Sequence, residues 1–205
     1  MPKKYAPADH ESRIWDAWIE ADAFSADPDR VLLGEAGPYT ILIPPPNVTA
    51  ALHLGHALNN TIQDILIRAH RMKGCETMWL PGTDHAGIAT QTVVEKRVMA
   101  DEGKRRTDFS RSEFIAKVQA FKDEYEARIT AQLKAMGSSC DWDRQRFTMD
   151  PICARAVREA FFKLFKDGLI YRGKRLVNWD PITQTALADD EVETQEVDGA
   201  FYCLR

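Results

Sequence analysis

The sequence predicts an α/β fold in which short parallel strands alternate with helices. Two apolar runs, residues 39–43 and 77–80, have the length and composition of buried strands. Between them, residues 53–73 carry apolar side chains three and four positions apart, as one face of a helix does. A strand, a helix and a second strand within about 40 residues form a βαβ unit, whose two strands run parallel.

Helical patterns recur on both sides of this unit. Ser110 followed by Glu113 forms a capping box, and the apolar stripe that starts there continues to Gly137, which ends the helix. Pro151 suits the first turn of another helix, which Gly168 closes, with Cys153, Val157, Ala160, Phe161 and Leu164 facing inward. Shorter helices are expected at residues 9–22 and 90–99.

The inward-facing positions of the 53–73 helix are expected to be Leu54, Leu58, Ile62, Ile65, Ala69 and Met72. Residues 25–38 are expected to form a loop with a brief extended piece at 31–33. Residues 138–150 are expected to be irregular or to form a short hairpin. Further strands are expected at 170–171, 176–179 and 201–204, with the acidic stretch from residue 186 to 193 as a connection.

Composition excludes several classes of protein. With 44% hydrophobic and 28% charged residues, the chain reads as an ordinary soluble domain. The net charge of −4 argues against a chain that is basic throughout and coats nucleic acid. An apolar run of about 18 residues is missing, so no membrane span is expected. Four widely spaced cysteines and the lack of a secretory signal indicate a cytoplasmic protein, with each thiol serving as a small buried side chain.

The stretch after the first strand has the features of a nucleotide site. Three prolines at 44–46 stiffen the turn, and a helix follows, whose first amides and dipole favour a phosphate. His53 and His56 lie three positions apart on the first turn, and Gly55 between them leaves room for a flat ligand. A metal site is a rival interpretation, but a third ligand is not evident.

Two stretches resemble a known family. The first consists of Pro44-Pro45-Pro46-Asn47-Val48-Thr49 with His53-Leu54-Gly55-His56. The second is Leu80-Pro81-Gly82-Thr83-Asp84-His85-Ala86-Gly87-Ile88-Ala89-Thr90-Gln91. Both are similar to the signatures of class I aminoacyl-tRNA synthetases. Within that class they are most similar to the valyl enzymes. The resemblance continues through residues 146–150 and 176–181, so it covers nearly the whole chain.

The resemblance implies a ligase that joins valine to tRNA(Val), using ATP with Mg²⁺ as its substrate complex. It implies that His53 and His56 are catalytic, that Thr49, His53, Gly55 and His56 bind ATP, and that Pro45, Asn47 and Asp84 bind the amino acid. From the residues alone, Asp84 could instead be a turn aspartate, and His85 a structural histidine. No zinc is expected, because Asp180 and Thr183 stand where some relatives have cysteines. Ala50 stands where the valyl enzymes usually have glycine, and a positive φ there would be costly.

The resemblance also predicts how the chain is divided. Residues 1–38 are expected to be a helix and loop packed on the core, and residues 39–185 the first half of a Rossmann-like catalytic domain with a helical extension. Residues 186–205 would be a connection and the start of a truncated editing insertion. The Lys-rich loop that closes the site in this class is not found in the chain, so this piece is expected to be nearly inactive alone. A truncated paralogue that binds nucleotide or amino acid without catalysis, and a small H-x-G-H nucleotidyltransferase, are the alternatives.

Overall fold

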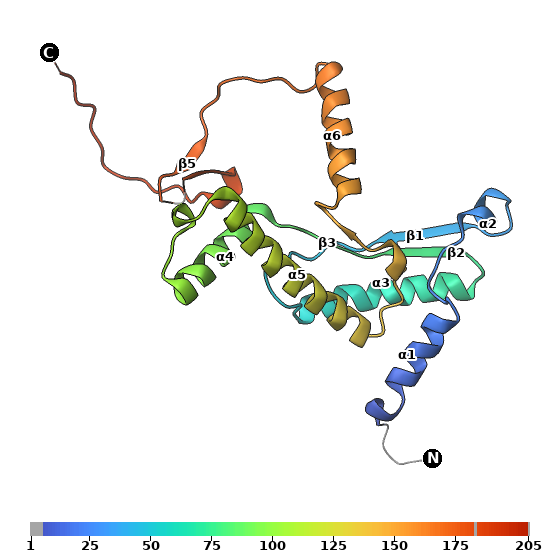
Figure 1. The fold of residues 1–205 in the computed structure, drawn as a ribbon. Coiled ribbons are helices and arrows are strands. Elements are labelled where there is room, and N and C mark those ends of the chain that lie inside the picture. The colour runs from blue at the N-terminus through green and yellow to red at the C-terminus, as the bar shows by residue number, and fades with distance from the viewer. Residues whose placement is uncertain (1–5, 183, 205) are drawn as a thin grey trace. The chain divides into compact units, whose positions relative to one another are not determined.

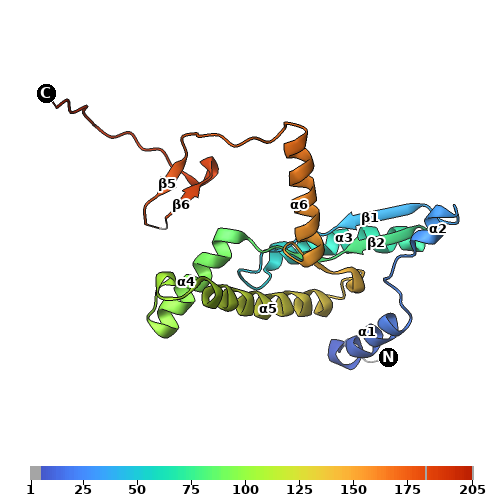
Figure 2. The same ribbon diagram turned by 45° about the horizontal axis from the view of Figure 1, so that its top comes forward.

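The computed structural model describes residues 6–182 and 184–204. At its centre, strands β1 (Pro38–Leu42) and β2 (Glu76–Leu80) pair in parallel, with Tyr39 opposite Thr77 and Ile41 opposite Trp79. Helix α3 (Leu54–Met72) connects them and runs alongside both strands (Figures 1 and 2). The predicted βαβ unit and the α/β class are therefore confirmed.

The chain divides into two compact units between Arg158 and Glu159. In the first unit, β3 (Gly82–Thr83) pairs in parallel with β4 (Arg146–Phe147); in the second, β5 (Asn178–Asp180) pairs antiparallel with β6 (Thr185–Leu187). The remaining α-helices are α1 (Glu11–Glu20), α2 (Pro28–Leu32), α4 (Gly87–Glu102), α5 (Arg111–Ala135) and α6 (Pro151–Lys166). Short 3₁₀ helices cover Pro7–Asp9, Arg106–Asp108, Trp142–Arg144 and Asp189–Glu191.

The first unit has two adjoining apolar clusters. One joins the sheet, α3 and α5, and its fully buried members include Ile43, Ile67, Trp79, Ile129 and Leu133. The other joins α4 to α5 through Val94, Val98, Phe114 and Phe121. Helix α5 contributes to both clusters and so links α4 to the sheet. Figure 2 shows α4 beside one end of α5.

The predicted start and end of α5 are confirmed. Ser110 is the N-cap: its Oγ accepts from the Glu113 amide at 3.3 Å, and the Glu113 carboxylate accepts from the Ser110 amide at 2.8 Å. This reciprocal pair satisfies two amides that lack partners inside the helix. Gly137 follows the helix with φ of +75°, a conformation that glycine adopts without steric cost.

The expected orientation of α3 is wrong, although its bounds are confirmed. Leu54, Leu58, Ile62, Ile65 and Met72 are all more than half exposed, and the buried residues are Asn60 and Ile67. The polar side faces inward because its groups find partners there: Trp79 Nε1 donates to Gln63 Oε1 at 3.0 Å, and Ser139 Oγ donates to Asp64 Oδ1 at 2.6 Å. Such bonds remove the usual cost of turning polar side chains inward.

Of two connections in the first unit, one differs from expectation and the other takes one of its two expected forms. Residues 28–32 form a helix rather than an extended piece, because Asp27 caps it by accepting from the Asp29 amide at 3.0 Å and Pro28 suits the first turn. Residues 138–150 are mainly irregular, as one of the two expected forms, and do not form a hairpin. They include a 3₁₀ turn and then β4, which pairs with β3 from a distant part of the chain, a pairing that local pattern cannot reveal.

Towards the C-terminus the bounds of α6 are confirmed, and its predicted burial is wrong, since no residue of this helix is buried. Residues 170–171 and 201–204 are not strands, and only the end of the 176–179 run enters β5. The acidic connection includes β6 and a 3₁₀ turn. A short apolar run becomes a strand only when another strand pairs with it, and β5 and β6 pair only with each other among the described residues.

Helix α1, which belongs to the first unit, contacts the segment that follows α5. Trp15 lies edge-on to Trp142, with ring centroids 6.2 Å apart, and Trp18 lies against Phe24 at 5.7 Å. The four cysteines are free; Cys140 is buried, whereas Cys203 is exposed, contrary to the expectation for that residue. No helix within residues 6–182 and 184–204 has the length and apolar composition of a membrane span.

Candidate functional site

Both signature stretches lie at the carboxyl ends of the parallel strands. Beyond β1 and β2, the Ile43 amide donates to the Leu80 carbonyl at 3.1 Å. The pairing resumes as an isolated parallel bridge between Asn47 and Asp84. In this bridge the Asp84 amide donates to the Pro46 carbonyl at 2.8 Å, and the Val48 amide donates to the Asp84 carbonyl at 3.0 Å. Ligands of parallel sheets bind at this end, so the placement matches the expectation from strand order.

A cavity of about 600 Å³ opens between the proline turn and the start of α3. Six of the seven predicted site residues line it: Pro45, Asn47, Thr49, His53, Gly55 and His56. Its volume is within the range of small-molecule sites. Asp84 does not line this cavity, but its bridge to Asn47 places the two residues side by side at the strand ends.

The loop from residue 47 to 53 is anchored at both ends. Val48 is completely buried in the main cluster, and the Leu52 amide donates to Gln132 Oε1 of α5 at 2.9 Å. Ala50 lies between these anchors and does not have a positive φ. The strain that alanine would cause at that position therefore does not arise.

The two histidines cap the helix that they begin. His53 Nδ1 accepts from the Gly55 amide at 3.1 Å, and His56 Nδ1 accepts from the His53 amide at 3.3 Å. A nitrogen that accepts cannot carry a proton, so both rings are neutral with the proton on Nε2. The helix start thus fixes the tautomer of each ring and leaves two Nε2–H groups as donors for a ligand.

The surroundings of His56 favour the same neutral form. Burial lowers the pKa of His56 below its usual value, and a charge on His53 would lower it further. The rings are close, with centroids 4.0 Å apart. Two imidazolium ions at that separation would repel each other, so the doubly charged pair is disfavoured.

Gly55 has a steric role that the sequence did not reveal. A Cβ at this position would lie 2.9 Å from Cε1 and 3.0 Å from Nδ1 of His53. These distances are shorter than a relaxed carbon contact allows. Glycine is therefore required to let the His53 ring fold back onto the Gly55 amide, in addition to any room it gives a ligand.

Asp84 is held by its own turn and by a second segment. Its Oδ2 accepts from the Ala86 amide at 3.2 Å, and its Oδ1 accepts from the Thr148 hydroxyl at 2.9 Å. Ala86 has φ of +52° and Gly87 φ of +41°, so the turn that starts α4 is left-handed. Asp84 can therefore stabilise its own turn and also bind a ligand, since a carboxylate has about four acceptor positions.

Two residues that hold the site were not assigned a role from sequence. Thr148 belongs to the stretch at 146–150 that carried the resemblance, but nothing in that stretch showed what its hydroxyl contacts. Gln132 lies on an otherwise ordinary helix, and no sequence signal distinguishes it. Both contact the site from elements more than 60 residues away.

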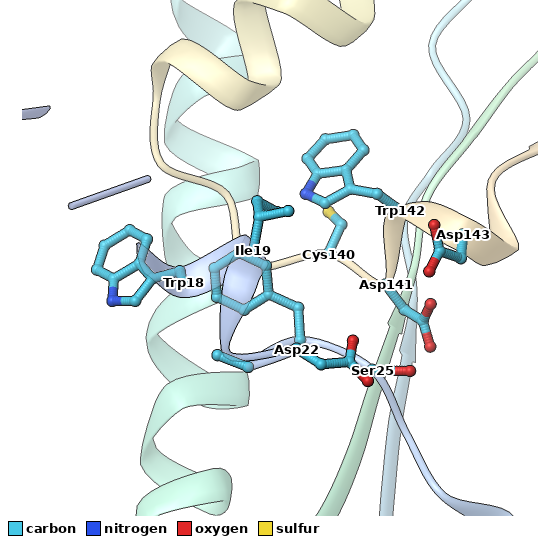
Figure 3. Close-up of a pocket in the computed structure, with 10 residues that line it drawn as sticks. Trp18, Ile19, Asp22, Ser25, Cys140, Asp141, Trp142 and Asp143 are labelled. Carbon is cyan, nitrogen blue, oxygen red and sulfur yellow. The ribbon is translucent and has the colours of Figure 1, made fainter. Parts of the chain in front are cut away.

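Other cavities of the first unit do not contain the predicted residues. A cavity of about 1090 Å³ lies along α4 and α5, with His85 and Phe147 in its lining. A small one, about 80 Å³, lies between the end of α1 and the segment after α5 (Figure 3). There the buried Asp141 carboxylate accepts from the Ala26 amide at 3.2 Å and from Arg144. The Asp141 amide donates to the Trp79 carbonyl of β2 at 2.9 Å, so Asp141 ties the N-terminal segment to the sheet. Among the described residues, no group of three or more His, Cys, Asp and Glu could hold a metal; Thr183 lies outside them.

Comparison with known proteins agrees with this geometry. The family of tRNA synthetases class I (I, L, M and V) matches residues 13–201. Valine–tRNA ligases of Rhodopirellula baltica and Chlamydia pneumoniae are 54% and 53% identical to the chain over all 205 residues. The chain spans only about a fifth of their length, 19% and 21%. Neither the paralogue nor the small nucleotidyltransferase finds support in these matches.

The fold is similar to that of a solved structure. In the ternary complex of Agrobacterium radiobacter K84 agnB2 LeuRS with tRNA and LeuAMS, the synthetase chain superposes with a TM-score of 0.75 at 23% identity. The match covers 91% of this chain and 22% of that one. The strand-end cavity, the histidine-capped helix and this fold agree with the family match over nearly the whole sequence. The chain therefore belongs to the class I tRNA synthetases, the family of the isoleucine, leucine, methionine and valine enzymes.

Proposed function

We propose that this chain is the N-terminal catalytic part of a valine–tRNA ligase and binds valine and ATP, the latter as its Mg²⁺ complex. The observation that carries the proposal is the pair of Nε2–H donors of His53 and His56 at the start of α3, in a cavity lined by the proline turn. The valine–tRNA ligases that are more than half identical over the whole chain support valine as the amino acid.

The proposed reaction needs few groups from the protein. A carboxylate oxygen of valine attacks the α-phosphorus of ATP; the bond from that phosphorus to the bridging oxygen breaks, and pyrophosphate leaves. The phosphoryl oxygens gain negative charge in the transition state, and neutral Nε2–H donors aimed at them stabilise that charge. The protein supplies no nucleophile, because the substrate carboxylate is the nucleophile.

Asp84 completes the proposed amino-acid site. A carboxylate at the strand end forms a charge-assisted bond with the α-ammonium group of valine, while Pro45 and Asn47 border the cavity on the side of the same bridge. The resulting valyl-adenylate then reacts with the terminal ribose hydroxyl of tRNA(Val), which forms the ester and releases AMP.

We also propose that different parts of the chain have different functions. Residues 39–185 form the first half of the catalytic domain, and residues 186–205 begin an insertion that removes wrongly attached amino acids. Since the relatives are about five times longer, further parts of the catalytic site would come from sequence that these 205 residues do not include.

The test is ATP–pyrophosphate exchange with a panel of amino acids. The protein as its gene encodes it should exchange with valine far faster than with leucine, isoleucine or methionine, and the 205-residue chain alone should be nearly inactive. Exchange that prefers another amino acid would refute the valine assignment. Substantial valine-dependent exchange by the 205-residue chain would refute its dependence on the rest of the ligase.

A further inference from the structure

We propose that Thr148 is a positioning residue for amino-acid binding, because its hydroxyl fixes the carboxylate of Asp84 and the ring of His85 together. The inference rests on the proposed function, in which Asp84 binds the α-ammonium group of valine. Its basis is a set of three hydrogen bonds made by one oxygen atom. Thr148 Oγ1 lies 2.9 Å from Asp84 Oδ1, 3.0 Å from the His85 amide nitrogen and 2.6 Å from His85 Nδ1.

The hydrogen-bonding capacity of a hydroxyl determines the direction of each bond. A threonine hydroxyl has one hydrogen to donate and two lone pairs to accept with. The carboxylate of Asp84 can only accept, so it receives the single hydrogen. The two lone pairs then accept from the His85 amide and from His85 Nδ1–H. Every donor and acceptor position of this hydroxyl is therefore occupied.

The same matching of donors to acceptors gives His85 a different tautomer from that of His53 and His56. His85 carries its proton on Nδ1, where it donates to Thr148. In the neutral ring, Nε2 is then an acceptor, whereas in the two capping histidines Nε2 is the donor. The His85 side chain is 42% exposed and belongs to the lining of the cavity along α4 and α5. The hydrogen bonds therefore distinguish His85 from the two histidines that cap α3.

Thr148 is itself held firmly from a distant part of the chain. Its amide donates to the Thr83 carbonyl at 3.1 Å, which extends the parallel pairing of β3 with β4. The side chain of Asp84 is 31% exposed, and two of its acceptor positions are taken, by Thr148 and by the Ala86 amide. The remaining positions can accept an ammonium group, while the two internal bonds prevent the carboxylate from rotating away.

The experiment measures KM for valine and KM for ATP in the ATP–pyrophosphate exchange of the protein as its gene encodes it. The variants are Thr148→Val, which keeps the shape and removes the hydroxyl, Thr148→Ala, which also removes it, and Thr148→Ser, which keeps it. Thr83→Val is the matched control: its hydroxyl donates to Glu126 at 3.0 Å rather than to the site, and it lies on the strand that pairs with β4. Since KM does not depend on the amount of folded enzyme, partial misfolding of a variant does not hide the answer.

The expected result is a rise of about tenfold in KM for valine in Thr148→Val and Thr148→Ala, the size expected for losing a bond to a charged group. KM for ATP should change less than about twofold, and Thr148→Ser should restore KM for valine to within about threefold of the original. An unchanged KM for valine in Thr148→Val, equal rises for both substrates, or the same rise in Thr83→Val would overturn the inference. If the unaltered protein shows no valine-dependent exchange, the proposed function itself fails, and this inference fails with it.

Discussion

Replacing Gly55 by alanine should displace the ring of His53. The new Cβ would lie 2.9 Å from Cε1 of the His53 ring, so the ring must turn away from the Gly55 amide. The helix loses an N-cap bond, which costs about 1 kcal/mol of stability. Alanine also has a higher helix propensity than glycine by up to about 1 kcal/mol, and this gain opposes the loss. The free energy of unfolding should therefore change by less than about 1 kcal/mol.

Activity should respond much more strongly than stability. When the ring turns, its Nε2–H no longer points to the position that it occupies in the unaltered cavity. Loss of one positioned donor of this kind costs about 2.7–4 kcal/mol of transition-state stabilisation, which corresponds to roughly a 100- to 1000-fold lower kcat. The assay is valine-dependent ATP–pyrophosphate exchange at saturating ATP and valine, with the free energy of unfolding measured by urea denaturation.

Gly37→Ala is the control for this prediction. Gly37 precedes β1 and does not have a positive φ, and a Cβ added there would meet no heavy atom of the described residues within 4 Å beyond its chain neighbours. The substitution should leave the rate essentially unchanged. It should change the free energy of unfolding by less than about 0.5 kcal/mol. A rate within about threefold of the original in Gly55→Ala, or a loss of activity matched by an equal loss of stability, would contradict this role of Gly55.

Three further predictions concern other parts of the protein. The folded protein lowers the pKa of His56 below its usual 6.5, so the unfolded chain takes up the proton more readily, and the free energy of unfolding should fall as the pH falls below 6.5. In His56→Gln this pH-dependent part of the free energy of unfolding should be missing. Identical pH profiles for the variant and the unaltered protein would contradict the prediction. Ser110→Ala should reduce the free energy of unfolding by about 1 kcal/mol through loss of the α5 cap, with an unchanged denaturation midpoint as the contrary result. Burial raises the pKa of the Cys140 thiol, so iodoacetamide should label Cys203 quickly and Cys140 only on unfolding, and peptide mass spectrometry showing equal rates would contradict this.

Local sequence signals predicted most of the first unit because they act over a few residues. Ser110 and Glu113 form their capping box within one helical turn, and the apolar runs that became β1 and β2 lie on either side of a single helix. The proline turn and the histidine pair likewise depend on neighbouring positions, so the lining of the cavity followed from the motif.

Long-range contacts account for the features that were not predicted. Periodicity identified the two sides of α3 but not which side turns inward, and that was decided by bonds such as Trp79 with Gln63 and Ser139 with Asp64. The pairing of β4 with β3 and the contact of Thr148 with Asp84 join segments about 60 residues apart. A single sequence contains no signal for such partners.

Removing the Nε2–H groups of His53 and His56 tests whether these neutral donors act on the phosphates of ATP, and the measured quantity is the rate of valine-dependent ATP–pyrophosphate exchange. In the protein as its gene encodes it, His53→Ala and His56→Ala should each lower kcat roughly 100-fold or more. Asparagine at position 53 keeps a side-chain oxygen that can cap the helix, so His53→Asn should recover the stability lost in His53→Ala but not the rate. Exchange within about threefold of the unaltered rate in both alanine variants would contradict the account.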